Sequence, residues 1–115
     1  MKAVMLLLAA GMALAAEKPE TVMVTCHAKA GSEAALERVL ARHWSTIEQL
    51  KLVTAAPHVR LRGVDSGGKT YFVEVFTWRD GSVPDHAPAA VQAIWGEMNQ
   101  LVDGAGVEIA EVTRW

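Results

Sequence analysis

Cysteine is almost absent from this chain of 115 residues, which contains only Cys26. No disulfide can form within the chain, so a small disulfide-stapled scaffold is excluded. Positive charge is not in excess either, because 11 lysine and arginine residues stand against 13 acidic residues and the formal net charge is −2. A mildly acidic chain does not attract nucleic acid or anionic lipid electrostatically. We therefore expect neither nucleic acid nor a membrane surface as a partner.

No apolar run is long enough to span a bilayer, which takes about 20 residues in a helix. At the N-terminus, Lys2 precedes a short apolar run at residues 4–10 and a small-residue stretch that ends at Ala16. This order is typical of a secretory signal peptide, although a buried N-terminal helix would also fit it. We expect a signal peptide at residues 1–16, one domain at residues 17–115, and a periplasmic or secreted mature protein with no membrane attachment. Signal removal takes away only Lys2 and leaves a net charge near −3.

Familiar catalytic signatures are missing as well. The sequence has no nucleophile elbow, no phosphate-binding loop and no Cys/His catalytic pattern. Its four histidines show neither the i, i+4 helical spacing nor the clustering with cysteine that dedicated metal sites use. We expect no metal site and no cofactor.

The first half of the chain has clear apolar periodicity. Residues 21–28 alternate, with Val22, Val24 and Cys26 on one side, which predicts a strand and a buried thiol. After Ser32, placed as an N-cap, apolar residues recur at three- and four-residue steps as far as residue 50. This spacing predicts a long amphipathic helix.

The second half predicts a hairpin, a helix and a strand. Residues 58–64 and 70–78 alternate on either side of a glycine turn; a helix capped by Asp85 follows near residue 86, and residues 107–113 alternate again. The order strand, helix, strand, strand, helix, strand predicts an α+β, ferredoxin-like βαββαβ fold. It has a four-stranded antiparallel sheet with both helices on one face.

The hairpin predicts two chemically different faces. If residues 64 and 70 are opposite each other, the register pairs Arg60 with Glu74 and Arg62 with Phe72. One face, which we expect to pack on the helices, would consist of Val59, Leu61, Tyr71, Val73 and Val75. The other, with Phe72, Phe76 and Trp78 among charged residues, is too apolar to remain wet. A second copy packing face to face would cover it.

In these features the chain resembles the dimeric α/β barrel superfamily, and within it the antibiotic biosynthesis monooxygenase-like domains. The resemblance covers residues 21–113 in element order. Locally it consists of a strand that ends in Trp78, a polar turn, and His86 shortly before Pro88 at the start of the second helix. The helix entry at residues 30–33, Ala-Gly-Ser-Glu, is also similar to the family pattern.

The resemblance implies a homodimer with a pocket between sheet and helices, often for a polycyclic, aromatic or haem-like ligand. Members include cofactor-independent monooxygenases, haem-degrading enzymes and proteins with no known reaction. The haem-degrading branch has an Asn on the first strand, and a Trp before a His on the second helix. Here the first strand has no Asn, and His86 precedes Trp95. The sequence departs from that branch.

His86 is the candidate catalytic residue, as a general base or a hydrogen-bond donor at a helix entry. A histidine there can equally contact only backbone or solvent. Trp78, Phe76 and Trp95 are candidate substrate-binding residues that would form aromatic walls, although they can also belong to the core or a dimer interface.

Arg60 and Glu74 are the remaining candidate substrate-binding residues, as a polarised pair in the same pocket, with Arg62 free to hold a ligand carboxylate. The alternative is a cross-strand ion pair with little effect on stability.

Two functional hypotheses follow. In the first, the protein is an exported homodimer that binds a small hydrophobic or aromatic molecule and, if it is an enzyme, resembles the cofactor-independent monooxygenases. In the second, it is a non-catalytic binding or interaction module whose aromatic residues only close the dimer interface. An open cavity with polar groups would favour the first hypothesis.

Overall fold

The computed structural model describes residues 18–115, so the expected signal peptide lies outside the described residues. Its elements are β1 (Glu20–Ala28), α2 (Glu33–Gln49), β2 (Val59–Val64), β3 (Thr70–Trp78), the short 3₁₀ helix η1 (Val83–His86), α3 (Ala89–Leu101) and β4 (Val102–Glu111). The strands form one antiparallel sheet in the order β2-β3-β1-β4. The predicted ferredoxin-like fold is confirmed.

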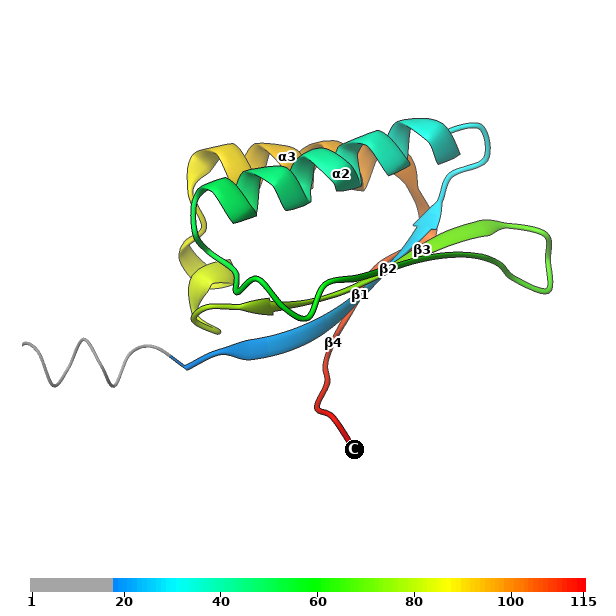
Figure 1. Ribbon diagram of the computed structural model, residues 1–115. Helices are drawn as coiled ribbons and strands as arrows, with labels where there is room; N and C mark the ends of the chain where they lie inside the picture. The colour runs from blue at the N-terminus through cyan, green and yellow to red at the C-terminus, as the bar shows by residue number, and fades with distance from the viewer. Residues whose placement is uncertain (1–17) are drawn as a thin grey trace, which may run out of the picture.

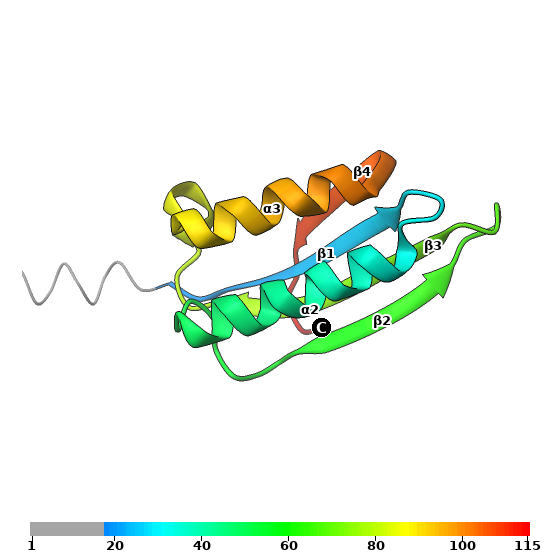
Figure 2. The same ribbon diagram turned by 90° about the horizontal axis from the view of Figure 1, so that it is seen from above.

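The molecule has two layers (Figure 1). Both helices lie on one face of the sheet, and the opposite face is left uncovered. Seen from above, α2 and α3 run side by side across the sheet (Figure 2). Arg42 on α2 pairs with Glu97 on α3 and ties the two helices together on the outer side. The space between helices and sheet contains the hydrophobic core.

The faces of the hairpin are the reverse of the sequence prediction. The predicted register is confirmed, including Arg60 opposite Glu74 and Arg62 opposite Phe72. However, Phe72 and Phe76 are 7% and 1% exposed beneath the helices. The reason is the pairing of β3 with β1, which places these two rings opposite the buried residues Cys26 and Val22. Because the rings fill the space below the helices, the aliphatic residues of the hairpin lie on the uncovered face.

The uncovered face is nevertheless apolar. Its most exposed aliphatic side chains are Met23, Val59 and Leu61, at 37%, 42% and 60% exposure. Tyr71 lies across Gly63 in the neighbouring strand so closely that a Cβ at Gly63 would overlap the hydroxyl end of the tyrosine ring. An aromatic ring of this kind fills the gap that a glycine leaves in a sheet. The face therefore presents apolar side chains around Leu61, and the ion pair of His27 with Glu108 lies on the same face.

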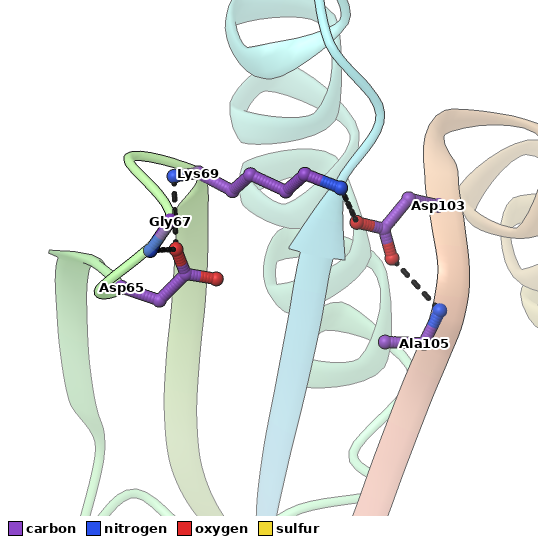
Figure 3. A network of polar contacts seen from close by, with 5 residues as sticks. All are labelled: Asp65, Gly67, Lys69, Asp103 and Ala105. Atoms are coloured by element: carbon purple, nitrogen blue, oxygen red, sulfur yellow. Dashed lines mark hydrogen bonds and ion pairs between the residues drawn. The ribbon is translucent and has the colours of Figure 1, made fainter.

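Two acidic residues organise the end of the sheet opposite the N-terminus of β1 (Figure 3). Asp65 accepts hydrogen bonds from the backbone N–H groups of Gly67 and Lys69, at 2.8 and 3.0 Å, and fixes the β2–β3 turn. The Lys69 Nζ lies 3.9 Å from the carboxylate of Asp103, which accepts a hydrogen bond from Ala105 N–H. The β2–β3 turn is thereby linked to the start of β4, across the end of β1.

The second helix and the last strand begin at other residues than predicted. The second helix begins at Ala89 with Pro88 as its N-cap, so Asp85 is part of η1 and does not cap it. Since a residue that precedes proline is disfavoured in the helical region, a separate 3₁₀ turn before Pro88 is reasonable. The last strand starts directly after the helix, at Val102.

The predicted burial of Cys26 is confirmed. None of the helices at residues 18–115 has the length and apolar character to cross a membrane.

Candidate functional site

Five of the six predicted site residues line one of two cavities, and His86 lines neither. The larger one, which we call the first cavity, has a volume of about 470 Å³ and lies between the sheet, η1 and both helices. Its lining includes three of the predicted residues, Phe76, Trp78 and Trp95. The rest of its wall comes from Glu20, Val22, Val24, His43, Gly81, Pro84, Asp85, Met98, Asn99, Val107 and Ile109. Most of this surface is apolar, as in a typical small-molecule pocket.

The aromatic residues of the first cavity are arranged nearly at right angles. The Phe76 and Trp78 rings are 5.0 Å apart at 83°, and the Trp78 and Trp95 rings are 6.5 Å apart at 84°. Edge-to-face packing of this kind is favourable and holds each ring in one orientation. Trp78 is 4% exposed, whereas Trp95 is only partly buried. A flat ligand would therefore meet a rigid aromatic wall.

His43 lines the first cavity and was not among the predicted site residues. It is 4% exposed, and its Nε2 accepts a hydrogen bond of 2.9 Å from the indole N–H of Trp95. Burial lowers the pKa of His43 to about 4, so the ring is neutral near pH 7. Because Nε2 accepts, the single proton lies on Nδ1, which has no hydrogen-bond partner. His43 thus fixes the orientation of the Trp95 indole without adding a charge.

The rim of the first cavity has acidic groups and no basic ones. Glu20 and Asp85 line the cavity, and neither takes part in any ion pair found within residues 18–115. Together with Asn99 and the neutral His43, they make up the ionisable and amide side chains of the lining. The rim therefore offers hydrogen-bond acceptors to a ligand hydroxyl.

His86, the predicted catalytic residue, lies at the end of η1 near this rim. It is exposed, and its Nε2 is 3.2 Å from the hydroxyl of Ser82 in the same turn. It is not part of the lining of either cavity. Its neighbour Asp85 does line the first cavity, so His86 is one residue away. A catalytic role for His86 stays a prediction, and it would require the ring to turn toward the rim.

The other two predicted residues, Arg60 and Glu74, line a second cavity of about 250 Å³ between α2 and the hairpin. The sequence had placed them with the tryptophans, but only Val24 belongs to both linings. The second cavity is the more charged of the two. Its remaining wall consists of Cys26, Glu37, Leu40, Leu61, Arg62, Phe72 and Val73.

Glu74 has a different partner from the one the sequence suggested. Its Oε2 is 2.7 Å from Nε2 of His58, and Glu74 is 5% exposed. Burial raises the pKa of Glu74, while the hydrogen bond and the charge of His58 and the charge of Arg60 act in the opposite direction. The His58 ring in turn stacks on Trp44, with 3.5 Å between the ring centres and 12° between the planes. The structure therefore contains an oriented Trp44, His58 and Glu74 series.

Part of this arrangement has a signal in the sequence. His43 and Trp95 both fall on the apolar stripes of their helices, and this spacing places their polar ring nitrogens inside the core. Buried polar groups are almost always hydrogen-bonded, and a contact between the two could have been anticipated. The stack of Trp44 on His58 had no local signal, because it joins a helix to the residue before a strand.

Metal binding gains no support from the geometry. Within residues 18–115, no group of three or more His, Cys, Asp and Glu side chains is arranged to hold a metal ion. The chemistry available is hydrogen bonding at the rim of the first cavity, aromatic contact inside it, and a paired carboxylate in the second.

A two-layer βαββαβ protein with an apolar cavity between its layers and an exposed apolar sheet face has the architecture of a dimeric α/β barrel subunit. The chain has the fold of the antibiotic biosynthesis monooxygenase-like proteins of that class. No family model matches the sequence, and no curated protein is similar enough to be a relative.

The similarity is to solved structures. One is SnoaB, a cofactor-independent oxygenase from Streptomyces nogalater, with a TM-score of 0.61, 20% identity, and coverage of 85% of this chain and 95% of SnoaB. A second, described as an antibiotic biosynthesis monooxygenase, has a TM-score of 0.62, 13% identity and coverage of 85% and 99%. A third is a dimeric ferredoxin-like protein of unknown function from Jannaschia sp. CCS1, with a TM-score of 0.63, 13% identity and coverage of 84% and 100%. At these identities the likeness establishes the fold.

Proposed function

We propose that this protein is an exported homodimer whose first cavity binds a small hydrophobic or aromatic molecule. The observation that carries the proposal is the first cavity itself, about 470 Å³ of mainly apolar space with a rigid wall of Phe76, Trp78 and Trp95. A pocket of that size is within the range that holds drug-sized molecules. Polar groups at the rim, Glu20 and Asp85, would orient ligand hydroxyls.

Homodimer formation is supported by the uncovered face of the sheet. It carries exposed aliphatic side chains on two strands, Met23 on β1 and Val59 and Leu61 on β2. A patch of this kind on a small domain usually marks an interface. The structure from Jannaschia sp. CCS1 with the same fold is described as dimeric. A second copy would bury the face without covering the first cavity, which lies on the opposite side of the sheet.

If the protein is an enzyme, we propose a cofactor-independent monooxygenase. SnoaB, which shares the fold, is described as a cofactor-independent oxygenase. In such a reaction a phenol and O₂ can give a quinone and water, so that the phenol supplies all the electrons and no external reductant is consumed. A reaction that consumes no external reductant would suit a protein outside the cytoplasm. The aromatic wall would position the ring, and a rim carboxylate or His86 would accept the phenolic proton.

Light scattering followed by ligand screening tests this proposal. We expect a dimer in solution, and a raised melting temperature with a quinol, a flavonoid or haem. Trp95→Ala should abolish the shift, because it removes one aromatic wall and the partner of His43. Arg38→Gln, an exposed change on α2 away from both linings, is the matched control. A stable monomer that responds to none of the ligands would refute the proposal.

His86→Ala separates catalysis from binding. If His86 accepts a proton, turnover of a phenol should fall by a factor of about 10²–10⁴ while the ligand-induced thermal shift remains. Unchanged turnover would remove His86 from the mechanism and leave the rim carboxylates as the candidates. Asp85→Asn is the companion variant, since Asp85 lines the cavity directly.

Export is supported by the N-terminal pattern of residues 1–16. Expression of the full chain followed by cell fractionation should place the protein outside the cytoplasm, and N-terminal sequencing should begin at residue 17. An uncleaved cytoplasmic product would contradict this part of the proposal only.

A non-catalytic interaction module is the second candidate. Phe76 and Trp78 are 1% and 4% exposed and already contribute to the core. Their packing would be needed for the fold whether or not a ligand binds. A dimer with no ligand response would favour this candidate.

A further inference from the structure

The second cavity contains a buried carboxylate, Glu74, in an otherwise apolar row of side chains. Along β3 the helix-facing positions are occupied by Phe72, Glu74, Phe76 and Trp78, and all four are buried. Glu74 is the only ionisable member of this row. Taking a carboxylate out of water is costly unless it is paired, and an apolar residue at the same position would often be as stable or more so. Glu74 is paired with His58, and a ligand that also uses this carboxylate would give a functional reason for an ionisable residue in an otherwise apolar row.

Glu74 is oriented and has one carboxylate oxygen left over. Oε2 is bonded to His58, whose ring is fixed by its stack on Trp44. No hydrogen bond is found for Oε1 among the described residues. Even so, Oε1 is not fully buried, because His43 Nδ1 is the only buried side-chain nitrogen or oxygen without a partner in that part of the chain. Since Glu74 lines the second cavity, Oε1 is available there as an acceptor.

Two guanidinium groups line the same cavity, and among the described residues only that of Arg62 takes part in an ion pair. Arg62 lies 3.8 Å from Glu37 and 5.5 Å from the Phe72 ring, so it spans the cavity mouth between α2 and the sheet. Arg60 takes part in none of the ion pairs within residues 18–115. Arg60 is the register partner of Glu74, and directly paired residues have Cβ atoms about 4.5–5.5 Å apart on one face. A free cation and a free acceptor therefore lie side by side.

We propose that the second cavity binds a small carboxylic acid that also carries a hydroxyl group close to its carboxylate. Arg60 would hold the carboxylate through paired N–H donors, and Glu74 Oε1 would accept the hydrogen bond of the hydroxyl. The apolar walls, Val24, Leu40 and Phe72, would contact the rest of the ligand. The cavity volume of about 250 Å³ limits the ligand to one small ring or a short chain. This site is independent of the first cavity and of the function proposed for it.

Three related probes test the proposal: mandelate, phenylacetate, which lacks the hydroxyl, and 1-phenylethanol, which has a methyl group in place of the carboxylate. Binding is followed by calorimetry and by backbone amide shifts in NMR spectra. Mandelate should bind at least about tenfold more tightly than phenylacetate or 1-phenylethanol, because each of these two lacks one of the two polar contacts. The amide shifts should involve Arg60, Leu61 and Glu74.

Arg60→Gln is the decisive variant. Arg60 is exposed, so the fold should be unaffected, and melting temperature checks this. We expect mandelate to bind about tenfold more weakly and 1-phenylethanol to be unchanged. Arg38→Gln, which removes an exposed arginine outside both linings, should change neither.

Several outcomes would overturn the inference. They are no mandelate binding at millimolar concentration, equal binding of all three probes, full affinity in Arg60→Gln, or amide shifts confined to the first cavity. Failure of ligands to bind the first cavity would not affect the inference about the second cavity. Conversely, Trp95→Ala should abolish binding in the first cavity and leave mandelate binding intact, which distinguishes failure of one site from failure of the other.

Discussion

Replacing His43 by glutamine should remove a specific part of the pH dependence of stability. The pKa of His43 is lowered from 6.5 to about 4 by burial, so the unfolded chain takes up this proton at a higher pH than the folded protein does. Stability therefore decreases as the pH falls from about 6.5 toward 4. With 1.36 kcal/mol for each pKa unit, the full effect is about 3 kcal/mol, of which about 2 kcal/mol is lost between pH 7 and pH 5.

Glutamine is the appropriate replacement because it does not titrate and its amide oxygen can accept the N–H of Trp95 in place of Nε2. Urea denaturation of both proteins at several pH values gives the free energy of unfolding. Contributions of distant titrating groups cancel in the difference between the two proteins. We expect the wild type to lose about 2 kcal/mol more than His43→Gln between pH 7 and pH 5. Parallel pH profiles would refute the assignment of His43 as a buried neutral ring.

Two further predictions concern the uncovered face of the sheet. Leu61→Glu, at a side chain that is 60% exposed, should convert the dimer to a monomer in light scattering, whereas Leu50→Glu, on the 46% exposed residue after α2, should leave the dimer intact. A dimeric mass for both variants would mean that this face is not the interface. Gly63→Ala should destabilise the protein by about 1 kcal/mol in thermal unfolding, because the added methyl group overlaps the hydroxyl end of the half-buried Tyr71 ring and forces it to move. Gly104→Ala, which meets no atom within 4 Å, is the control, and an equal change in both would contradict the argument.

The order of the elements could be predicted because each one has its own local pattern. The stripe of α2 and the alternation of β1 depend only on which residues are apolar. The start of α3 was less accurate, since Asp85 looked like a cap although Pro88 favours an extended residue before it. Local chemistry at that position allowed two readings, and the backbone restriction decided between them.

The faces of the hairpin could not be predicted from its own pattern. A period of two indicates which residues share a face, but not which face the helices cover. That choice depends on β1, whose buried residues Val22 and Cys26 pair with Phe76 and Phe72. The pairing is a contact between distant segments of the chain, so the hairpin alone does not contain the answer.

The site was predicted only in part, because its arrangement also depends on contacts between distant segments of the chain. Phe76, Trp78 and Trp95 do come together, because β3 and the following helix, α3, both border the first cavity. Arg60 and Glu74 share the same strand face as Phe76, yet α2 crosses above the sheet and leaves them in a different cavity. Where a helix crosses a sheet depends on packing, and one-dimensional spacing does not contain that information.

The burial of Cys26 makes this residue a measure of how often the protein opens. Cys26 is 1% exposed, and burial, assisted by the negative charge of Glu74, raises the pKa of its thiol to about 12. A thiol-specific reagent needs the thiolate, so the closed protein should be almost unreactive. Labelling then occurs only in molecules in which the helices have separated from the sheet, and its rate reports the free energy of that opening. The single cysteine thus allows the breathing of the core to be timed in the unmodified protein, with and without a ligand in either cavity.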